Sequence, residues 1–196
     1  MGLYNAEISA GSLMLPESRR IARLLLQHPT VAQWNAALKD ENLLQKNPAT
    51  ARRQARLIRN RLDKLDDAGL LLIADGDGEV ASQTLLIGAI RHSRLLADFL
   101  RDVYGQDLRK LELKLSHRQW ESFIDERARI DEAIGGWASS TRDKLFQVIV
   151  RILAEAKYLD STRKMGLTPP LLHPTVIAYL KRAGDSETLA CMDFRR

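Results

Sequence analysis

The sequence predicts a mainly α protein made of two packed helical halves with helix-turn-helix or winged-helix character. Apolar residues recur at the three- and four-residue spacing that gathers side chains on one face of a helix. Short polar turns with proline, glycine or aspartate separate these segments. Near the C-terminus, "YLDSTRKMGLTP" has the pattern of a small β-hairpin wing with basic residues at its tip, following a helix.

The first two helices are delimited by prolines and a polar break. Pro16 marks the start of the first helix and Pro29 its end. The next helix begins in "TVAQWNAALK" and is expected to break near Asp40, followed by a short helical turn over residues 41–46.

The third helix lies in "NPATARRQARLIRNRLDKLD", where Thr50 is the expected N-cap and Gly69 the expected end. A helical stripe that must be buried is formed by Ala51, Ala55, Ile58, Leu62 and Leu65. At about 100° per residue, Arg52, Arg56 and Arg59 fall on the opposite side. Arg53 and Arg61 are expected on the two flanks of the apolar stripe.

Beyond this helix, Asp77 is expected to cap a long helical region that breaks near Ser93 and ends at Gly105. The following "QDLRKLELKL" is a candidate strand or linker, so we expect an N-terminal domain over residues 1–105 and a C-terminal domain over 106–196. The latter should contain a helix beginning near Ser116, a helix capped by Ser139 or Ser140, and a last helix ending at Gly184.

Positive charge is concentrated in the third helix. Residues 46–64 carry seven basic residues and one acidic residue, a net +6, whereas the whole chain of 196 residues carries +5. Arginines four residues apart repel one another, and the guanidinium fork suits phosphate oxygens. The pattern therefore favours contact with duplex DNA through Lys46, Arg52, Arg53, Arg56, Arg59 and Arg61.

A second, weaker basic set is expected around the wing, and it consists of Arg142, Lys144, Arg151, Lys157, Arg163 and Lys164. Of these, Arg142, Lys144, Arg163 and Lys164 are the candidate DNA contacts. Other interpretations stay open. The arginines are also compatible with docking on an acidic protein, with structured or single-stranded RNA, or with plain solvent exposure.

No catalytic or metal-binding motif stands out. An EF-hand loop beginning at Asp75 would need glutamate at its twelfth position, where Leu86 stands, and the four histidines show no close paired spacing. We therefore expect no enzymatic activity, no cofactor and no metal. No apolar run is long enough to span a bilayer, and the single Cys191 suits a reducing compartment, so we expect a cytoplasmic protein.

Three stretches resemble the BrxA family of the bacteriophage exclusion (BREX) systems: "YNAEISAGSLMLPESRRIARLLL", "RHSRLLADFLRDV" and "TPPLLHPTVIAYL". The resemblance covers nearly the whole chain. It implies a helical, non-enzymatic DNA-binding accessory protein in phage defence. It also implies partners among the other BREX components, namely a DNA methyltransferase, an ATPase, a phosphatase-like protein and a protease-like protein.

Overall fold

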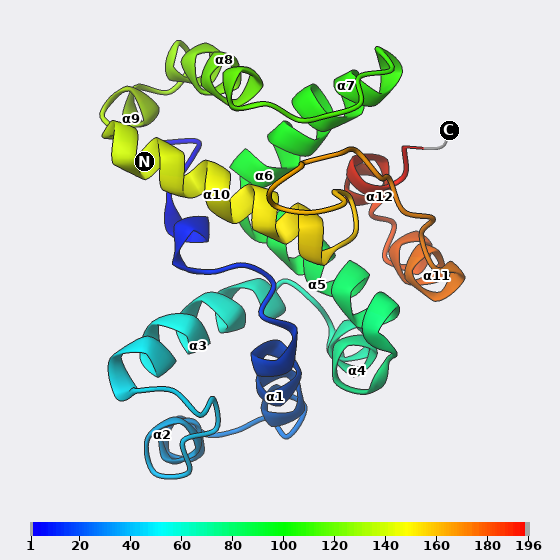
Figure 1. The fold of residues 1–196 in the computed structure, drawn as a ribbon. Helices are drawn as coiled ribbons and strands as arrows, with labels where there is room; N and C mark the ends of the chain where they lie inside the picture. Colours follow the sequence, from blue (N-terminus) through cyan, green and yellow to red (C-terminus); the bar gives the residue numbers. More distant parts are fainter. Residues whose placement is uncertain (1, 195–196) are drawn as a thin grey trace.

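The computed structural model describes residues 2–194 and confirms a mainly helical fold (Figure 1). Helix α5 (Gly78–His92) runs through the centre, and most of its side chains are buried. The elements before it are η1 (Glu7–Ala10), α1 (Leu15–Leu25), α2 (Val31–Lys39), α3 (Pro48–Leu62) and α4 (Asp67–Asp75). Those after it are α6 (Arg94–Phe99), the π-helical η2 (Leu100–Tyr104), α7 (Gly105–Arg109), α8 (His117–Ala128), α9 (Glu132–Gly135), α10 (Ser139–Glu155), α11 (Pro174–Arg182) and α12 (Ser186–Met192).

Several helix starts agree with the polar residues that predict them. The side chains of Asp77 and Ser93 accept hydrogen bonds from the first turns of α5 and α6, so the long helical region does break at Ser93. Ser116 and Gln119 form a reciprocal capping box at the start of α8. Local side-chain chemistry therefore determines these boundaries.

Other boundaries differ from the prediction. Asn47, not Thr50, caps α3, because its carboxamide accepts the Thr50 amide proton at 2.9 Å and Pro48 then occupies the first turn. Helix α3 ends at Leu62, well before Gly69, since Asp66 caps a separate helix, α4.

Three further expectations were wrong. Residues 41–46 form turns instead of a helical turn. Neither Ser139 nor Ser140 caps α10, whose N-cap is Ala138 without a side-chain hydrogen bond. The chain also continues past Gly184 into α12, which Asp185 caps.

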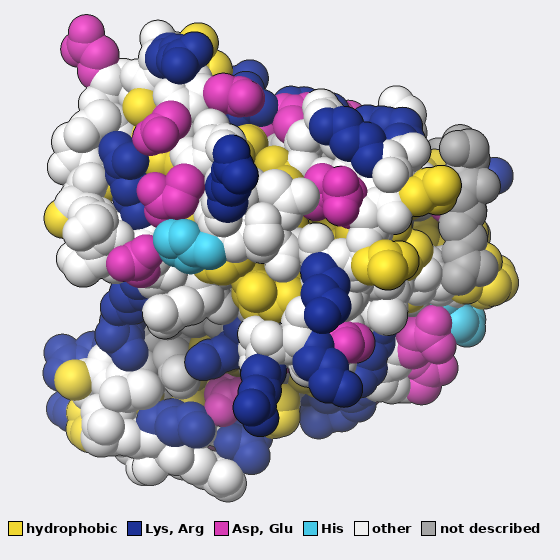
Figure 2. All heavy atoms as spheres, turned by 45° about the horizontal axis from the view of Figure 1, so that its top comes forward, with side chains coloured by type: hydrophobic (Ala, Val, Ile, Leu, Met, Phe, Trp, Pro, Cys, Tyr) yellow, Lys and Arg dark blue, Asp and Glu magenta, His cyan; other side chains and the backbone are white. Residues whose placement is uncertain are grey.

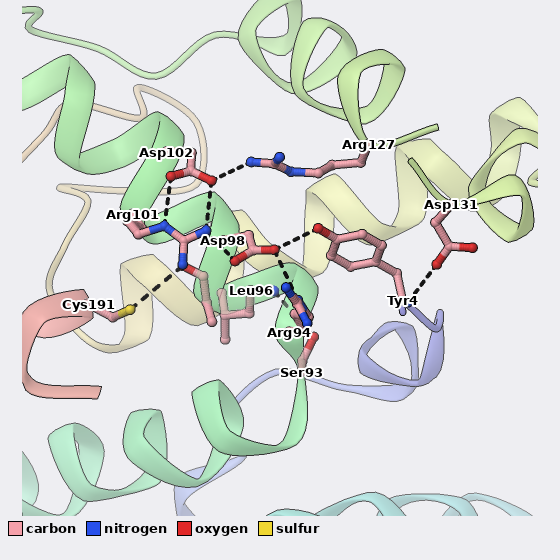
Figure 3. A network of polar contacts seen from close by, with 11 residues as sticks. Tyr4, Ser93, Arg94, Leu96, Asp98, Arg101, Asp102, Arg127, Asp131 and Cys191 are labelled. Carbon is pink, nitrogen blue, oxygen red and sulfur yellow. Dashed lines mark hydrogen bonds and ion pairs between the residues drawn. The ribbon is translucent and has the colours of Figure 1, made fainter. Parts of the chain in front are cut away.

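The N-terminal segment, residues 2–14, crosses from the lower to the upper part of the molecule and packs against α10 (Figure 1). The amide of Tyr4 donates to Asp131 at 2.9 Å, and its hydroxyl donates to the buried Asp98 at 2.7 Å (Figure 3). Arg94 and Arg101 also pair with Asp98. Buried apolar residues from the two halves belong to a single core cluster.

Gly105 lies within the helical run from α6 to α7, so the chain does not pass through a linker there. The division at residue 105 stays a prediction. Along residues 2–194, no helix is both long and apolar enough to cross a membrane.

The region expected to form a wing is a tight loop without regular strands in the described part of the chain. Isolated antiparallel bridges join Leu159 with Leu167 and Lys114 with Gly166. The amide of Gly166 donates to the Asp160 carboxylate at 2.9 Å, although the Asp160 amide donates to the Gly166 carbonyl. A side chain thus replaces the backbone acceptor, which interrupts the ladder of a regular hairpin.

Candidate nucleic-acid interface

The exposed face of α3 carries the arginines expected there. Ala51, Ala55, Ile58 and Leu62 are buried against the rest of the fold, as the periodicity predicts. Arg52, Arg53, Arg56 and Arg59 are exposed, and we call these four the α3 arginine face. Arg52 makes one long hydrogen bond to its own helix, while Arg53 and Arg56 make no side-chain hydrogen bond or ion pair within residues 2–194.

Arg59 is partly engaged. Its guanidinium carbon lies 4.6 Å from the centre of the Trp34 ring, and its Nε lies 3.7 Å from an Asp63 oxygen. The stacking fixes α2 against α3 and leaves Arg59 less available to an external anion. Trp34 thus serves helix packing.

Lys46 differs from the arginine face because it already has a carboxylate partner. Its Nζ lies 3.3 Å from the largely buried carboxylate of Glu17 on α1. This pair ties the turn before α3 to α1, so Lys46 is better understood as a structural cation.

Arg61 does not belong to the exposed set, contrary to the helix-wheel expectation. Its residue is 3% exposed, and its guanidinium donates to the backbone carbonyls of Gly11 and Ser12. Burial lowers its pKa to about 10, so it is still charged at neutral pH. The reason is long-range: the N-terminal segment covers this flank of α3.

A pocket borders the arginine face where α3 meets η1. Its volume is about 270 Å³, and Arg53, Arg56 and Asn60 line one side while Glu7 and Ser9 line the other. Lys and Arg side chains gather over α2 and α3 at the lower left of Figure 2, where few carboxylates are visible. The upper part, over α8 to α10, carries both signs of charge.

The second basic set also contains both a cation that is paired within the protein and cations that are exposed. Arg142 is mostly buried and pairs with Asp125 of α8 at 3.3 Å, so it joins two helices. Lys144 is exposed on α10, and Arg163 and Lys164 are exposed at the loop tip. The pKa of the Asp160 carboxyl is lowered, against the effect of desolvation, chiefly by the hydrogen bond from the Gly166 amide, with a smaller effect from the charge of Lys164.

The sequence-based prediction includes Arg151 of α10 but misses Gln147, another outward-facing residue of the same helix. Gln147 and Arg151 are exposed and lie three and seven residues after Lys144, on the same helical face. Their spacing alone predicts this neighbourhood. Asp143 and Glu155 are also exposed on α10, so its outer surface is less basic than that of α3.

A sequence comparison identifies the family that this fold represents. The model of the family described as BrxA matches residues 2–184. Three curated proteins, each called "BREX protein BrxA", are similar over nearly their full length. The relative from Paramagnetospirillum magneticum is 36% identical over 190 residues, with 96% of each chain covered.

The relative from Escherichia coli is 33% identical, covering 97% of this chain and 90% of its own. The relative from Bacillus cereus is 26% identical, covering 93% and 92%. A crystal structure of an uncharacterized protein from Magnetospirillum magneticum has a TM-score of 0.91 and 34% identity, and the match covers 97% of this chain and 98% of that one.

Proposed function

Because this chain belongs to the BrxA family, we propose that it is a non-enzymatic accessory protein of a BREX phage-defence system that binds duplex DNA mainly through phosphates. The observation that carries the proposal is the α3 arginine face. Like charges held side by side on one helix repel in the free protein, and phosphates would relieve that repulsion. Arginine donates two parallel hydrogen bonds to a phosphate, which a lysine cannot do.

Pairing within the protein divides the cations into two kinds. Lys46, Arg61 and Arg142 are bound to acceptors of the protein itself, so they add to the fold rather than to a surface. Arg52, Arg53 and Arg56 keep their donors for an external partner. We therefore assign the main DNA contact to these three residues, with Arg59 at its edge.

The order of elements in the C-terminal half supports a second contact. Helices α6 to α7 are followed by an extended segment near Lys114, then by α8, α10 and the loop over residues 158–168. Isolated bridges from Gly166 to Lys114 and from Leu167 to Leu159 place this loop beside the extended segment that precedes α8. We infer that α10 and the loop tip lie against the duplex, with Lys144, Arg151, Arg163 and Lys164 near phosphates.

The test is the salt dependence of binding to a duplex. If roughly five of these cations each neutralise one phosphate, the slope of log affinity against log salt should be about −4 to −5. Replacing Arg52, Arg53 and Arg56 together with alanine should reduce the magnitude of the slope by about three and weaken binding to every sequence. Alanine is at least as favourable in a helix, so the melting temperature should stay the same or rise slightly.

A matched control removes the same charge elsewhere. Arg109, Lys181 and Arg182 are exposed and lie on α7 and α11, away from α3. Their replacement with alanine should leave most of the slope intact. If both variants lost DNA affinity and salt slope equally, only the net charge of the protein would matter. If neither variant lost DNA affinity, docking on an acidic protein would be favoured. Tighter binding to RNA of matched length would support an RNA-binding function instead.

A further inference from the structure

Three potential metal ligands meet on the surface between α8 and α10. His117 is the first residue of α8, Glu121 follows one turn later on the same face, and Asp143 extends from α10. His117 Nε2 lies 3.2 Å from Asp143 Oδ1 and 3.7 Å from Glu121 Oε1. One donor atom from each residue lies within 4.8 Å of both others.

These separations suit a small divalent ion. Zinc bonds to nitrogen and oxygen are about 2.0–2.2 Å long, so neighbouring donors in a tetrahedral site are about 3.3–3.6 Å apart. The two distances from the histidine nitrogen already lie near that range. About half of each side chain is exposed, so the carboxylates have room to adjust.

The backbone beneath the three ligands is held in place by buried aromatic rings. Trp120 of α8 stacks on Phe146 of α10 with ring centres 5.7 Å apart and an interplanar angle of 27°. The His117 and Phe146 rings are nearly perpendicular, with centres 5.2 Å apart and an interplanar angle of 84°. Because Trp120 is fully buried, the relative position of the two helices is defined before any ion binds.

We propose that His117, Glu121 and Asp143 form a binding site for a divalent transition-metal ion, with Zn²⁺ as the ion to test. Two carboxylates provide two negative charges, which a divalent cation neutralises. The imidazole nitrogen favours zinc over magnesium and calcium, which take oxygen ligands. Three protein ligands leave a coordination position for water. The bound ion would link α8 to α10.

This site shows why histidine spacing alone is a poor guide. The sequence contains no paired histidines, and on that basis no metal was expected. In the fold, the partners of His117 are carboxylates, one of them 26 residues away on another helix. The proposal is independent of DNA binding.

The experiment is calorimetric titration of ZnCl₂ into the full chain, after removal of any polyhistidine tag and treatment with a chelator. We expect one equivalent to bind, no comparable binding of Mg²⁺ or Ca²⁺, and a higher melting temperature with Zn²⁺. His117→Ala, and separately Asp143→Asn, should weaken Zn²⁺ binding by at least about tenfold.

The control is His28→Ala, because His28 is another exposed histidine beside a carboxylate, 3.7 Å from Asp67. This variant should bind Zn²⁺ like the wild type. Circular dichroism without metal confirms that each variant is folded. Absence of Zn²⁺ binding in the wild type, unchanged binding in His117→Ala and Asp143→Asn, or loss of binding in His28→Ala would each overturn the proposal.

Discussion

Arg61 of α3 donates a buried hydrogen bond to the backbone carbonyl of Ser12, 49 residues earlier in the chain. The same segment is held from its other side by α10. Glu155 accepts hydrogen bonds from the Ser12 hydroxyl at 2.7 Å and from the Leu13 amide at 2.8 Å. The residues around Ser12 therefore connect α3 to α10 through polar contacts.

The first prediction concerns this connection. Arg61→Met keeps much of the side-chain volume but leaves the carbonyls of Gly11 and Ser12 without their donors. Unpaired buried acceptors should reduce the free energy of unfolding by about 2–4 kcal/mol. Urea unfolding measures this reduction in the free energy of unfolding. The control is Arg52→Ala on the exposed side of α3, whose stability should be nearly unchanged. Equal stability of the two variants would contradict the structural role of Arg61.

Gly88 should be intolerant of a side chain. A Cβ atom there would lie 2.9 Å from the Arg61 carbonyl oxygen, because α5 and α3 approach closely at this point. Gly88→Ala should therefore cost about 1–3 kcal/mol, although alanine normally favours a helix. Gly78→Ala in the same helix meets no atom within 4 Å and should be neutral or slightly stabilising. Thermal melts of the two variants decide the comparison.

Asp107 should destabilise the fold at neutral pH. Burial, with a smaller effect of Glu112, raises the pKa of Asp107, so the folded state binds a proton more tightly than the unfolded state. The protonated Asp107 side chain therefore stabilises the fold at low pH. This stabilisation is lost as the pH rises from the ordinary carboxyl pKa through the raised pKa of Asp107. Asp107→Asn removes this loss and keeps a partner for Gln119, which donates to Asp107 at 2.7 Å. Its melting temperature should exceed that of the wild type at pH 7, and the difference should shrink toward pH 3.

Asp66 should show the opposite dependence of stability on pH in the same experiment, because its pKa is lowered. The backbone hydrogen bond from Gly69 lowers the pKa of Asp66, so its contribution is present above the ordinary carboxyl pKa and is lost as pH falls through the lowered value. Asp66→Asn should therefore be less stable than the wild type at pH 7 and approach it in acid. If the stability difference from the wild type changed with pH in the same direction for both variants, one of the two assignments would be refuted.

The loop tip should contribute to DNA binding without contributing to stability. Arg163 and Lys164 are exposed, so replacing both with alanine should leave the melting temperature nearly unchanged. If the loop lies on the same duplex as α3, the magnitude of the salt slope should fall by a further one to two beyond the triple α3 variant. An unchanged slope would remove the C-terminal half from the proposed interface.

Local patterns predict the exposed face of α3 well. The spacing of Ala55, Ile58 and Leu62 identifies the buried side, and Arg52 and Arg56 follow on the other. The relation between residues three and four apart is a property of the helix itself, so no knowledge of the tertiary fold is needed. The same holds for Asp77 and Ser93, whose caps depend on their own first turns.

Distant contacts explain what the sequence does not reveal. Arg61 has the same chemistry as its neighbours, and only the N-terminal segment, far away in sequence, determines that it is buried. Arg142 likewise depends on Asp125 of another helix. The loop over residues 158–168 has the composition of a hairpin, yet the Asp160 carboxylate takes over a backbone position. The amino-acid composition alone does not show that the Asp160 carboxylate competes with backbone carbonyls for the Gly166 amide.

The contact between Tyr4 and Asp131 has a consequence for how the chain is made. The two residues are 127 positions apart, so Tyr4 leaves the ribosome long before its partner exists. At about 5–20 residues per second, the Tyr4 amide waits roughly 6–25 s during translation before it can bond to Asp131. The N-terminal segment can contact Arg61 and Asp98 earlier in translation, but its full set of contacts is completed only after Asp131 has been made.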